Sequence, residues 1–366
     1  MAGLLRFRFY FLLIFSATCL NLVHGRCLPK NQHVALFIFG YSLFDPGNNN
    51  YFNTFVRANY WPYGEQFFKY STGRFTDGRI IPDFIAEYAN LPLIPPYLQS
   101  INHQFTYGVN FASGAAGALA ETNQGFVKDL KTQLSYFKDA EKLMRQKVGD
   151  AEAKTLFSKA VYLISIGAND YVSPFTVNST FYHTFSKQEY VKMVIGNLTD
   201  TIKEIYKKGG RKFGLFNMGT LGCIPTMKAL VPGNTGACFE EATELGKLHN
   251  AALSEALQEL EIKLVGLKLA KHDFNMSTSE RLNNPQKYSF KEVNIGCCGS
   301  GPYRGIFSCG GKRGGAEFEL CSNPSDYWYF DSSHISEKTQ KLLAELIWSG
   351  SPNITGPYNL KQLFEA

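Results

Sequence analysis

The chain of 366 residues is long enough for one large domain or two modest ones, each able to bury a core. With 45% hydrophobic, 14% aromatic and only 19% charged residues, it is too apolar and too aromatic for a disordered protein. Lysines and arginines number 37 against 31 acids, a formal charge of +6, but no run concentrates them. The composition therefore argues against nucleic acid as a partner.

Residues 1–25 have the layout of a secretory signal peptide. Two arginines near the start precede an apolar stretch that runs to Leu20, and Gly25 supplies a small residue suited to signal-peptidase cleavage. The apolar stretch is too short for a membrane span, and no later segment offers a stable membrane anchor. A buried N-terminal helix is the alternative. We expect a mature protein of residues 26–366 that is secreted and extracellular, with the vacuole or ER lumen as alternative compartments.

Apolar runs of strand length alternate with helical patterns along the mature chain. Five runs predict buried strands at 34–39, 107–112, 161–166, 212–217 and 267–272. Apolar residues at helical spacing predict helices at 188–207, 238–260 and 336–349. Such alternation favours a parallel sheet covered by helices on both faces, and no repeat or linker divides the chain. The sequence therefore predicts a single domain with surface insertions and a three-layer α/β fold.

Asparagine sequons indicate a glycosylated surface. The Asn-X-Ser/Thr pattern begins at four positions, Asn178, Asn197, Asn275 and Asn353. Each is a weak signal alone, but four of them behind a signal peptide predict a glycoprotein of the secretory pathway.

The cysteines point to the same compartment. Seven remain once residues 1–25 are removed, and six of these lie between residues 223 and 321. This grouping predicts disulfide bonds, with Cys223 near enough to Cys238 to be its partner, and the odd number leaves one thiol without an intrachain partner. The rival interpretation is a zinc site built from the four cysteines between 297 and 321. The lack of a Cys-x-x-Cys pair or a nearby histidine disfavours it.

Polar residues follow the predicted strands, at the edge where the working residues of parallel α/β sheets gather. Ser42 comes after the first strand, Gly114 after the second and Asn169 after the third. A serine at a tight strand-to-helix turn can project its hydroxyl, while backbone N–H groups and a side-chain amide can bind a developing negative charge. No G-x-G-x-x-G or Walker-type loop follows any of these strands, which argues against a nucleotide site.

Asp331 and His334 lie just before the last predicted helix. Their spacing in a turn can place a carboxylate and an imidazole on one side, so that Asp331 orients His334. His272 beside Asp273 is the competing pair, disfavoured because adjacent residues on an extended chain point to opposite faces. Each feature alone is commonly a cap or a turn, but their joint occurrence at strand ends predicts a catalytic serine site.

Motifs spread over the mature chain resemble those of the GDSL esterase/lipase family, the SGNH hydrolases, and within it the secreted plant GDSL lipases. The resemblance rests on FGYSLFDPGNNN (39–50), GVNFASG (108–114), IGAND (166–170) and DSSH (331–334). The closing segment 346–360 resembles a subgroup of these lipases linked to defence against microbes.

The resemblance implies a flavodoxin-like α/β/α fold with a parallel five-stranded sheet, and a serine ester hydrolase that needs no cofactor or metal. It implies Ser42 as the nucleophile, His334 as general base and then acid, and Asp331 as the group that holds His334. The oxyanion hole would consist of the backbone N–H groups of Ser42 and Gly114 with the Asn169 side chain. The expected partner is a small-molecule or lipid ester substrate.

Tyr41 departs from the family motif, which has an aspartate between the glycine and the serine. A bulky phenol replaces a short acid at the turn, and a misplacement of about 1 Å can cost about a hundredfold in rate. Two hypotheses follow. The first is an active esterase or lipase, favoured because the triad and oxyanion residues are kept together; the second is a catalytically weak relative that acts as a binding or adapter module.

Overall fold

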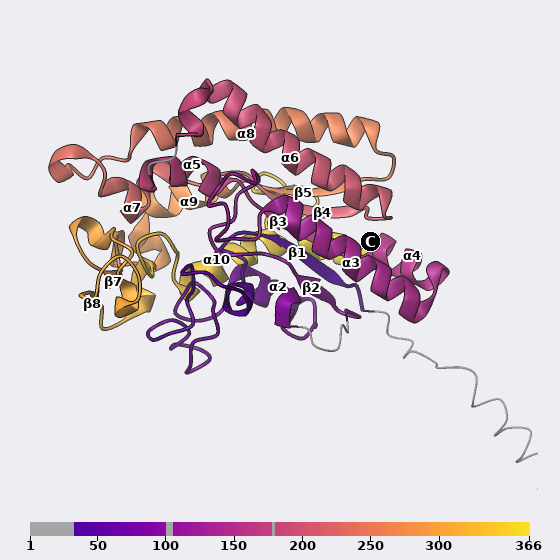
Figure 1. The fold of residues 1–366 in the computed structure, drawn as a ribbon, viewed down its shortest axis with the longest axis horizontal. Helices are drawn as coiled ribbons and strands as arrows, with labels where there is room; N and C mark the ends of the chain where they lie inside the picture. Colours follow the sequence, from indigo (N-terminus) through magenta and orange to yellow (C-terminus); the bar gives the residue numbers. More distant parts are fainter. Residues whose placement is uncertain (1–32, 100–104, 178–179) are drawn as a thin grey trace, which may run out of the picture. The chain divides into compact units, whose positions relative to one another are not determined.

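A six-stranded sheet with the order β10-β5-β4-β3-β1-β2 lies at the centre of residues 34–366 (Figure 1). The computed structural model describes residues 33–99, 105–177 and 180–366. The predicted signal peptide, Cys27 and the sequon at Asn178 lie outside the described residues. The boundary of the mature chain at residue 26 therefore stays a prediction.

Five strands of this sheet are parallel and correspond to the five predicted runs. They are β1 (Leu36–Gly40), β2 (Gly108–Asn110), β3 (Val161–Ser165), β4 (Lys212–Phe216) and β5 (Lys268–His272). The sixth, β10 (Thr355–Pro357), pairs antiparallel with β5 and corrects the prediction of a five-stranded sheet. A three-residue strand containing glycine and proline carries no hydrophobic alternation, and proline is tolerated there because the strand lies at an edge.

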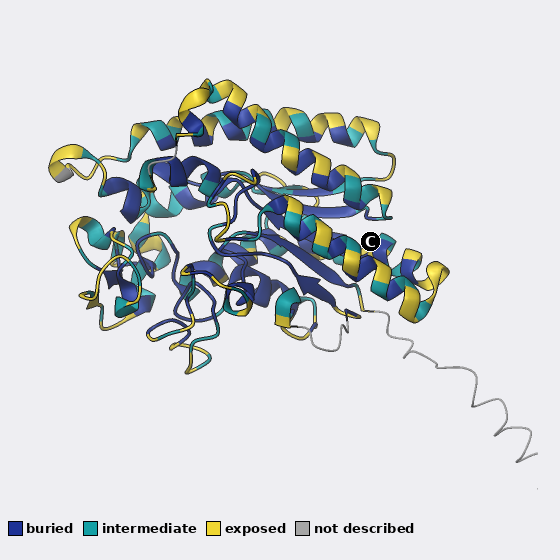
Figure 2. Cartoon of the chain, in the orientation of Figure 1, coloured by how far each residue is buried: buried dark blue, intermediate teal, exposed yellow. Residues whose placement is uncertain are grey.

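The residues of β1 show why helices cover both faces of the sheet. All five are buried, and because successive side chains point to opposite faces, Phe37 and Phe39 pack in one apolar cluster while Leu36 and Ile38 pack in another. The first cluster includes residues of α3 (Leu130–Val148), α4 (Asp150–Lys159), α6 (Lys187–Lys207) and α8 (Glu240–Lys263). The second includes residues of α2 (Ile81–Tyr88), α10 (Glu337–Ser349) and α11 (Leu360–Glu365). Figure 2 shows these strands buried between helices with exposed outer faces, so the predicted three-layer α/β/α fold is confirmed.

Helix boundaries follow local capping chemistry. Ser186 accepts a hydrogen bond from the Glu189 N–H and the Glu189 side chain accepts one from the Ser186 N–H, a capping box that starts α6 at Lys187. Ser336 caps α10 in a similar way through the Thr339 N–H. α8 begins at Glu240, two residues later than predicted, and runs on to Lys263. Three shorter helices lie among the connections, α5 (Ala168–Thr176), α7 (Pro225–Lys228) and α9 (Phe274–Asn283).

Disulfides join the six described cysteines in pairs. Cys223 bonds to Cys238, as predicted, and the other pairs are Cys297–Cys321 and Cys298–Cys309. The zinc interpretation of the four later cysteines is therefore wrong, because their sulfurs are consumed in disulfides. No group of three or more potential metal-binding side chains occurs among the described residues.

Two short strand pairs organise the cysteine-rich segment, residues 297–321: one joins the chain before this segment to the chain just before Asp331, and the other lies within the segment. β6 (Glu292–Gly296) pairs with β9 (Tyr327–Tyr329), and β7 (Cys298–Gly299) pairs with β8 (Glu319–Leu320). Within the described ranges, no helix is long and apolar enough to cross a membrane.

Candidate active site

Ser42 lies directly beyond the carboxyl end of β1. Gly40 ends this strand where a Cβ would come within 2.5 Å of the Ser165 carbonyl oxygen, so only glycine lets β1 approach β3 this closely. The chain then turns, with the Phe44 and Asp45 N–H groups donating to the Tyr41 carbonyl oxygen at 2.9 and 3.1 Å. The expected strand-to-helix turn is thus a hydrogen-bonded turn without an α-helix directly after it, and it places Ser42 in the cavity wall at the carboxyl ends of the strands.

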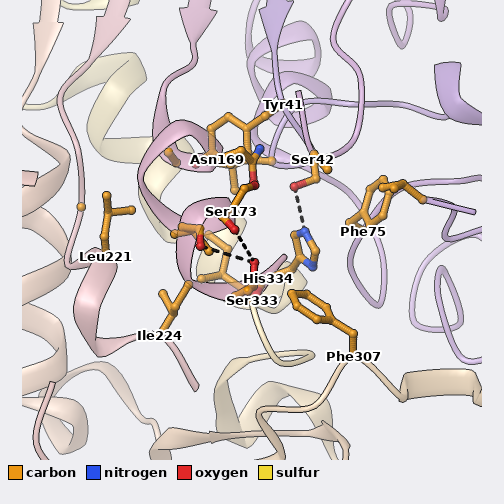
Figure 3. A pocket seen from close by; sticks show the side chains of 18 of the residues that line it. Tyr41, Ser42, Phe75, Asn169, Ser173, Leu221, Ile224, Phe307, Ser333 and His334 are labelled. Carbon is orange, nitrogen blue, oxygen red and sulfur yellow. Dashed lines mark hydrogen bonds between the residues drawn. The ribbon is translucent and has the colours of Figure 1, made fainter. Parts of the chain in front are cut away.

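The structure brings together the three predicted catalytic residues. His334 Nε2 lies 2.8 Å from Ser42 Oγ, and His334 Nδ1 lies 2.8 Å from both carboxylate oxygens of Asp331 (Figure 3 shows the Ser42–His334 contact). All three side chains are buried, with exposed fractions of 5%, 8% and 1% for Ser42, His334 and Asp331. A hydroxyl, an imidazole and a carboxylate in this order can generate a nucleophilic serine.

Asp331 is held by more than the imidazole. Its Oδ1 accepts hydrogen bonds from the Ser333 and His334 N–H groups at 2.9 and 2.8 Å, and its Oδ2 accepts one from the Tyr63 hydroxyl at 2.7 Å. Burial alone would raise the pKa of Asp331, but interactions with His334 and Arg313 outweigh it and hold the pKa at about 2. The carboxylate is therefore fixed and negatively charged across the physiological pH range.

Asn169 lies in the first turn of α5, after β3. Its Nδ2 donates to the Ala116 carbonyl oxygen at 2.9 Å, which fixes the amide and leaves its second N–H free to bind another acceptor. Figure 3 shows this side chain beside Ser42 in the cavity. The predicted position of Asn169 as a donor next to the nucleophile agrees with this geometry.

Gly114, the other predicted oxyanion donor, is engaged elsewhere. Its N–H donates to Asp45 Oδ2 at 2.9 Å and to Asn49 Oδ1 at 3.1 Å. The next residue, Ala115, lines the cavity with φ of 60°, and its N–H finds no acceptor among the described residues. An alanine held in the left-handed region is uncommon and marks a constrained backbone. The Gly114 N–H is thus occupied by side-chain acceptors while its neighbour Ala115 lines the cavity, a difference that depends on backbone torsions which the sequence does not display.

Polar residues after Ser42, not singled out from the sequence, position this backbone. The buried Asp45 carboxylate accepts the Gly47 and Asn48 N–H groups at 2.8 and 2.6 Å in addition to Gly114. Asn48 Nδ2 donates to carbonyl oxygens of the chain that follows β2, and Asn49 Oδ1 accepts the Ser113 hydroxyl at 2.6 Å. Burial raises the pKa of Asp45 to about 6, against the effect of these N–H donors. The run of asparagines therefore ties the nucleophile turn to the loop that carries Ala115.

The chain matches the GDSL-like lipase/acylhydrolase family over residues 36–347. It is 53% identical to GDSL esterase/lipase 1 of Arabidopsis thaliana over 96% of both chains. It is also 50% identical to a GDSL lipase of Tanacetum cinerariifolium, over 97% of this chain and 94% of that protein. The chain belongs to the GDSL lipase/acylhydrolase family. The prediction of a carboxylic ester hydrolase of this family is thereby confirmed.

A cavity of about 430 Å³ surrounds the serine of this GDSL hydrolase. Residues that follow β4 and β5 line one side of the cavity, and residues that follow β1 and β2 line the other. One side, here called the inner arm, is lined by Met218, Leu221, Ile224 and Phe274; the other, the outer arm, by Phe55, Val56, Phe75 and Phe126. In Figure 3, Leu221 and Ile224 lie on one side of the catalytic pair and Phe75 on the other.

Tyr41, the departure from the GDSL motif, lines the same cavity and packs against both apolar clusters of the core. Burial raises the pKa of Tyr41 to about 12, opposed by a hydrogen bond with Ser165, so the phenol is neutral. With Tyr41 at this position, His334 Nε2 still lies within hydrogen-bond distance of Ser42 Oγ, at 2.8 Å. The phenol therefore adds apolar surface next to the nucleophile without displacing it.

The competing histidine lies outside the site. His272 is buried in β5, where its Nδ1 lies 2.8 Å from Thr355 Oγ1 of β10. Burial lowers the pKa of His272 to about 3, so it is a neutral core residue.

The described sequons differ in exposure. Asn353 is exposed in a turn, and Asn197 is exposed on α6 with its Nδ2 bonded to the Ala118 carbonyl oxygen. Asn275 is half-buried in α9. Their glycosylation stays a prediction.

Proposed function

We propose that the protein is a secreted serine esterase or lipase in which Ser42 is the nucleophile, His334 the general base and acid, and Asp331 the group that holds His334. The observation that carries the proposal is the unbroken chain of hydrogen-bond contacts from Ser42 Oγ through His334 to Asp331, each 2.8 Å long. This arrangement removes the main obstacle to serine chemistry, since a neutral hydroxyl is a poor nucleophile until a base takes its proton.

The reaction proceeds in two half-reactions. His334 Nε2 takes the hydroxyl proton as Ser42 Oγ bonds to the ester carbonyl carbon, and the carbonyl oxygen becomes an oxyanion. When this tetrahedral intermediate collapses, the bond to the alcohol oxygen breaks and His334 returns the proton to the leaving alcohol. Water then attacks the acyl-enzyme with His334 again as base, and the carboxylic acid leaves as Ser42 recovers its proton.

We infer three donors for the oxyanion. They are the free N–H of the Asn169 amide and the backbone N–H groups of Ser42 and Ala115, neither of which has an acceptor among the described residues. Each such donor contributes about 3–4 kcal/mol to transition-state stabilisation. The amide is already held by Ala116, so it needs no reorganisation during the reaction.

The cavity favours an ester with apolar groups on both sides of its carbonyl, that is, a lipid ester. In the inner arm Met218 and Leu221 are buried, at 4% and 8% exposed, and the other two residues are half-buried, so this arm accommodates a group of limited size. The outer arm reaches solvent at Phe55 and Phe126, which are 63% and 46% exposed, so a longer chain can extend past them. The names of the relatives, which include lipases, fit this substrate class.

The alternative, a weak or inactive binding module, rests on Tyr41. The hydrogen-bond distance between Ser42 and His334 argues against it, because a turn tilted by the phenol would have separated these atoms. The neutral phenol instead supplies part of the apolar wall.

Three disulfides support an oxidising compartment, and with the predicted signal peptide and sequons they favour an extracellular glycoprotein. The resemblance of segment 346–360 to defence-linked lipases extends the proposal to ester hydrolysis in defence against microbes.

Hydrolysis of p-nitrophenyl butyrate by purified wild type, Ser42→Ala, Tyr41→Phe and Tyr41→Asp tests the proposal. We expect wild-type turnover that falls at least about 10⁴-fold in Ser42→Ala and stays within a few-fold in Tyr41→Phe. A fluorophosphonate probe should label wild type and spare Ser42→Ala. Activity confined to Tyr41→Asp would overturn the proposal in favour of the binding module.

A further inference from the structure

Arg313 brings a cation close to the triad without touching a carboxylate. Its Nε donates to the Tyr60 hydroxyl and its Nη2 to the Tyr63 hydroxyl, both at 2.8 Å, and its guanidinium carbon lies 5.5 Å from the centre of the Phe75 ring. Within the described part of the chain, no acidic side chain lies within ion-pair distance of it. The guanidinium is half-buried among aromatic rings and phenols, so water screens its charge only in part and the nearest anion gains importance.

The nearest anion is Asp331, which is linked to Arg313 by hydrogen bonds through Tyr63. The same hydroxyl that accepts from Arg313 donates to Asp331 Oδ2 at 2.7 Å, and the Tyr63 side chain is only 1% exposed. Accepting a hydrogen bond from a cation polarises a hydroxyl and makes it a stronger donor. Attraction to Arg313 is also among the interactions that lower the pKa of Asp331.

The cysteine-rich segment holds both ends of this contact. Arg313 lies between Cys309 and Cys321, which are bonded to Cys298 and Cys297. The backbone N–H groups of Cys297 and Cys298 donate to the carbonyl oxygens of residues 329 and 330, directly before Asp331. Two disulfides therefore fix the guanidinium relative to the catalytic carboxylate.

We propose that Arg313, acting through the Tyr63 hydroxyl, is a positioning residue that keeps Asp331 oriented and anionic while His334 carries the proton. The inference rests on the proposed function, since it assigns a role within that triad. In the intermediate, the proton of Ser42 sits on the imidazole and not on Asp331, because the carboxylate is stabilised as an anion on its far side. Neither Arg313 nor Tyr63 contacts the reacting atoms in this role.

The role has an electrostatic signature. Removing the fixed cation beside the Asp331–His334 pair changes the electrostatic field in which the pair works. The acidic limb of the kcat/KM profile reports the charge state of the catalytic groups in the free enzyme, and without the repulsion of Arg313 it should move to higher pH. A purely structural role would lower stability or rate without moving the limb.

The test uses the full-length protein and p-nitrophenyl butyrate over a range of pH. In Arg313→Gln the acidic limb of the kcat/KM profile should shift to higher pH by about one unit. Arg313→Lys keeps the charge but loses the planar fork that binds both phenols, so it should keep the limb near its wild-type position with reduced kcat. Tyr63→Phe retains the ring and should lower kcat about tenfold with little change in KM.

Arg304→Gln is the matched control, because Arg304 lies in the same cysteine-rich segment but pairs with Glu319. It should leave the limb where it is in wild type. A limb that does not move in a folded, active Arg313→Gln overturns the inference, and so does a change confined to KM, which would make Arg313 a substrate contact. Loss of activity in wild type itself would instead overturn the proposed function.

A second measurement needs no turnover. Because the native pKa of Asp331 lies below the unfolded value of 3.8, Asp331 contributes stability above about pH 4 that is lost as the pH falls toward 2. In Arg313→Gln this loss should be smaller than in wild type, measured as unfolding free energy by urea titration at pH 4, 3 and 2. An unchanged dependence would also overturn the inference.

Discussion

His334 Nε2 lies 2.8 Å from Ser42 Oγ although 292 residues separate them along the chain. Ser42 is carried by the turn after β1, and His334 by the turn between β9 and α10. α10 packs on the face of the sheet opposite to α3, which fixes the second turn at the carboxyl edge of the strands. The catalytic geometry is therefore a product of the packing of layers, and substitutions at the site can alter rate without unfolding the protein.

The Asn169 amide is expected to stabilise the oxyanion. Asn169→Ala should lower kcat by about 10²–10³-fold with little change in KM, because the donor acts mainly in the transition state. Asn123→Ala is the control: it removes an amide of the same size from the cavity wall, one that is bonded to Ala115 O and Ser173 Oγ. Steady-state kinetics should show a smaller loss of kcat for Asn123→Ala than for Asn169→Ala. Equal losses of kcat would contradict a role of Asn169 in the oxyanion hole.

The outer arm is expected to select for chain length. Phe126 packs against Phe55 in a tilted arrangement with ring centres 4.8 Å apart, and both residues line the cavity. Phe126→Ala should raise KM about tenfold for a p-nitrophenyl ester with a twelve-carbon acyl chain and hardly at all for the acetate. Tyr70→Ala removes another exposed ring, 66% exposed and outside the cavity lining, and should leave both values unchanged. A uniform effect on both esters would contradict a role in chain binding.

His249 is expected to make stability pH-dependent. It is fully buried against Tyr171, with Nδ1 2.8 Å from the phenol oxygen, and burial lowers the pKa of His249 to about 3. The folded state therefore keeps it neutral while the unfolded state takes up a proton below about pH 6.5. The free energy of unfolding should fall by about 1.4 kcal/mol per pH unit from this residue as pH drops from 6.5 toward 3.

His249→Gln removes this contribution, so its unfolding free energy should depend less steeply on pH between 6 and 4 than that of wild type. His183→Gln, at an exposed position, serves as the control and should retain the wild-type slope. Chemical denaturation at several pH values measures both. Identical slopes in wild type and His249→Gln would show that the imidazole is already protonated in the folded protein.

The Cys298–Cys309 disulfide is expected to stabilise both the fold and the site. It closes a separation of 11 residues, and its removal in Cys298→Ser/Cys309→Ser should lower the unfolding free energy by about 3 kcal/mol. Because this disulfide anchors the segment that carries Arg313, kcat should also fall at temperatures where the variant is folded. Cys223→Ser/Cys238→Ser should lose similar stability but retain more of kcat. Equal kcat values in the two double variants would show that the Cys298–Cys309 disulfide has no specific influence on the triad.

Much of the fold was predictable because it depends on local patterns. Continuous apolar runs such as 161–166 marked the buried strands, and the chemistry of Ser186 and Ser336 at helix starts kept boundaries close to prediction. The edge strand β10 was not predictable, since Thr355–Pro357 becomes a strand only because β5 offers it a free edge. The family motifs also predicted Ser42, Asn169, Asp331 and His334 as site residues, and the structure brings their side chains together at one cavity.

By itself the sequence determined the residue types of the site, the order of the parallel strands along the chain and the cysteines available for pairing. The tertiary structure decided which groups face the reacting ester. Gly114 and Ala115 are neighbours in sequence, but the Gly114 N–H donates to Asp45, whereas Ala115 has a left-handed backbone and lines the cavity. Likewise, only packing reveals that Tyr63 links Arg313 to Asp331, because hydrogen-bond direction depends on distances and angles between segments that are remote along the chain.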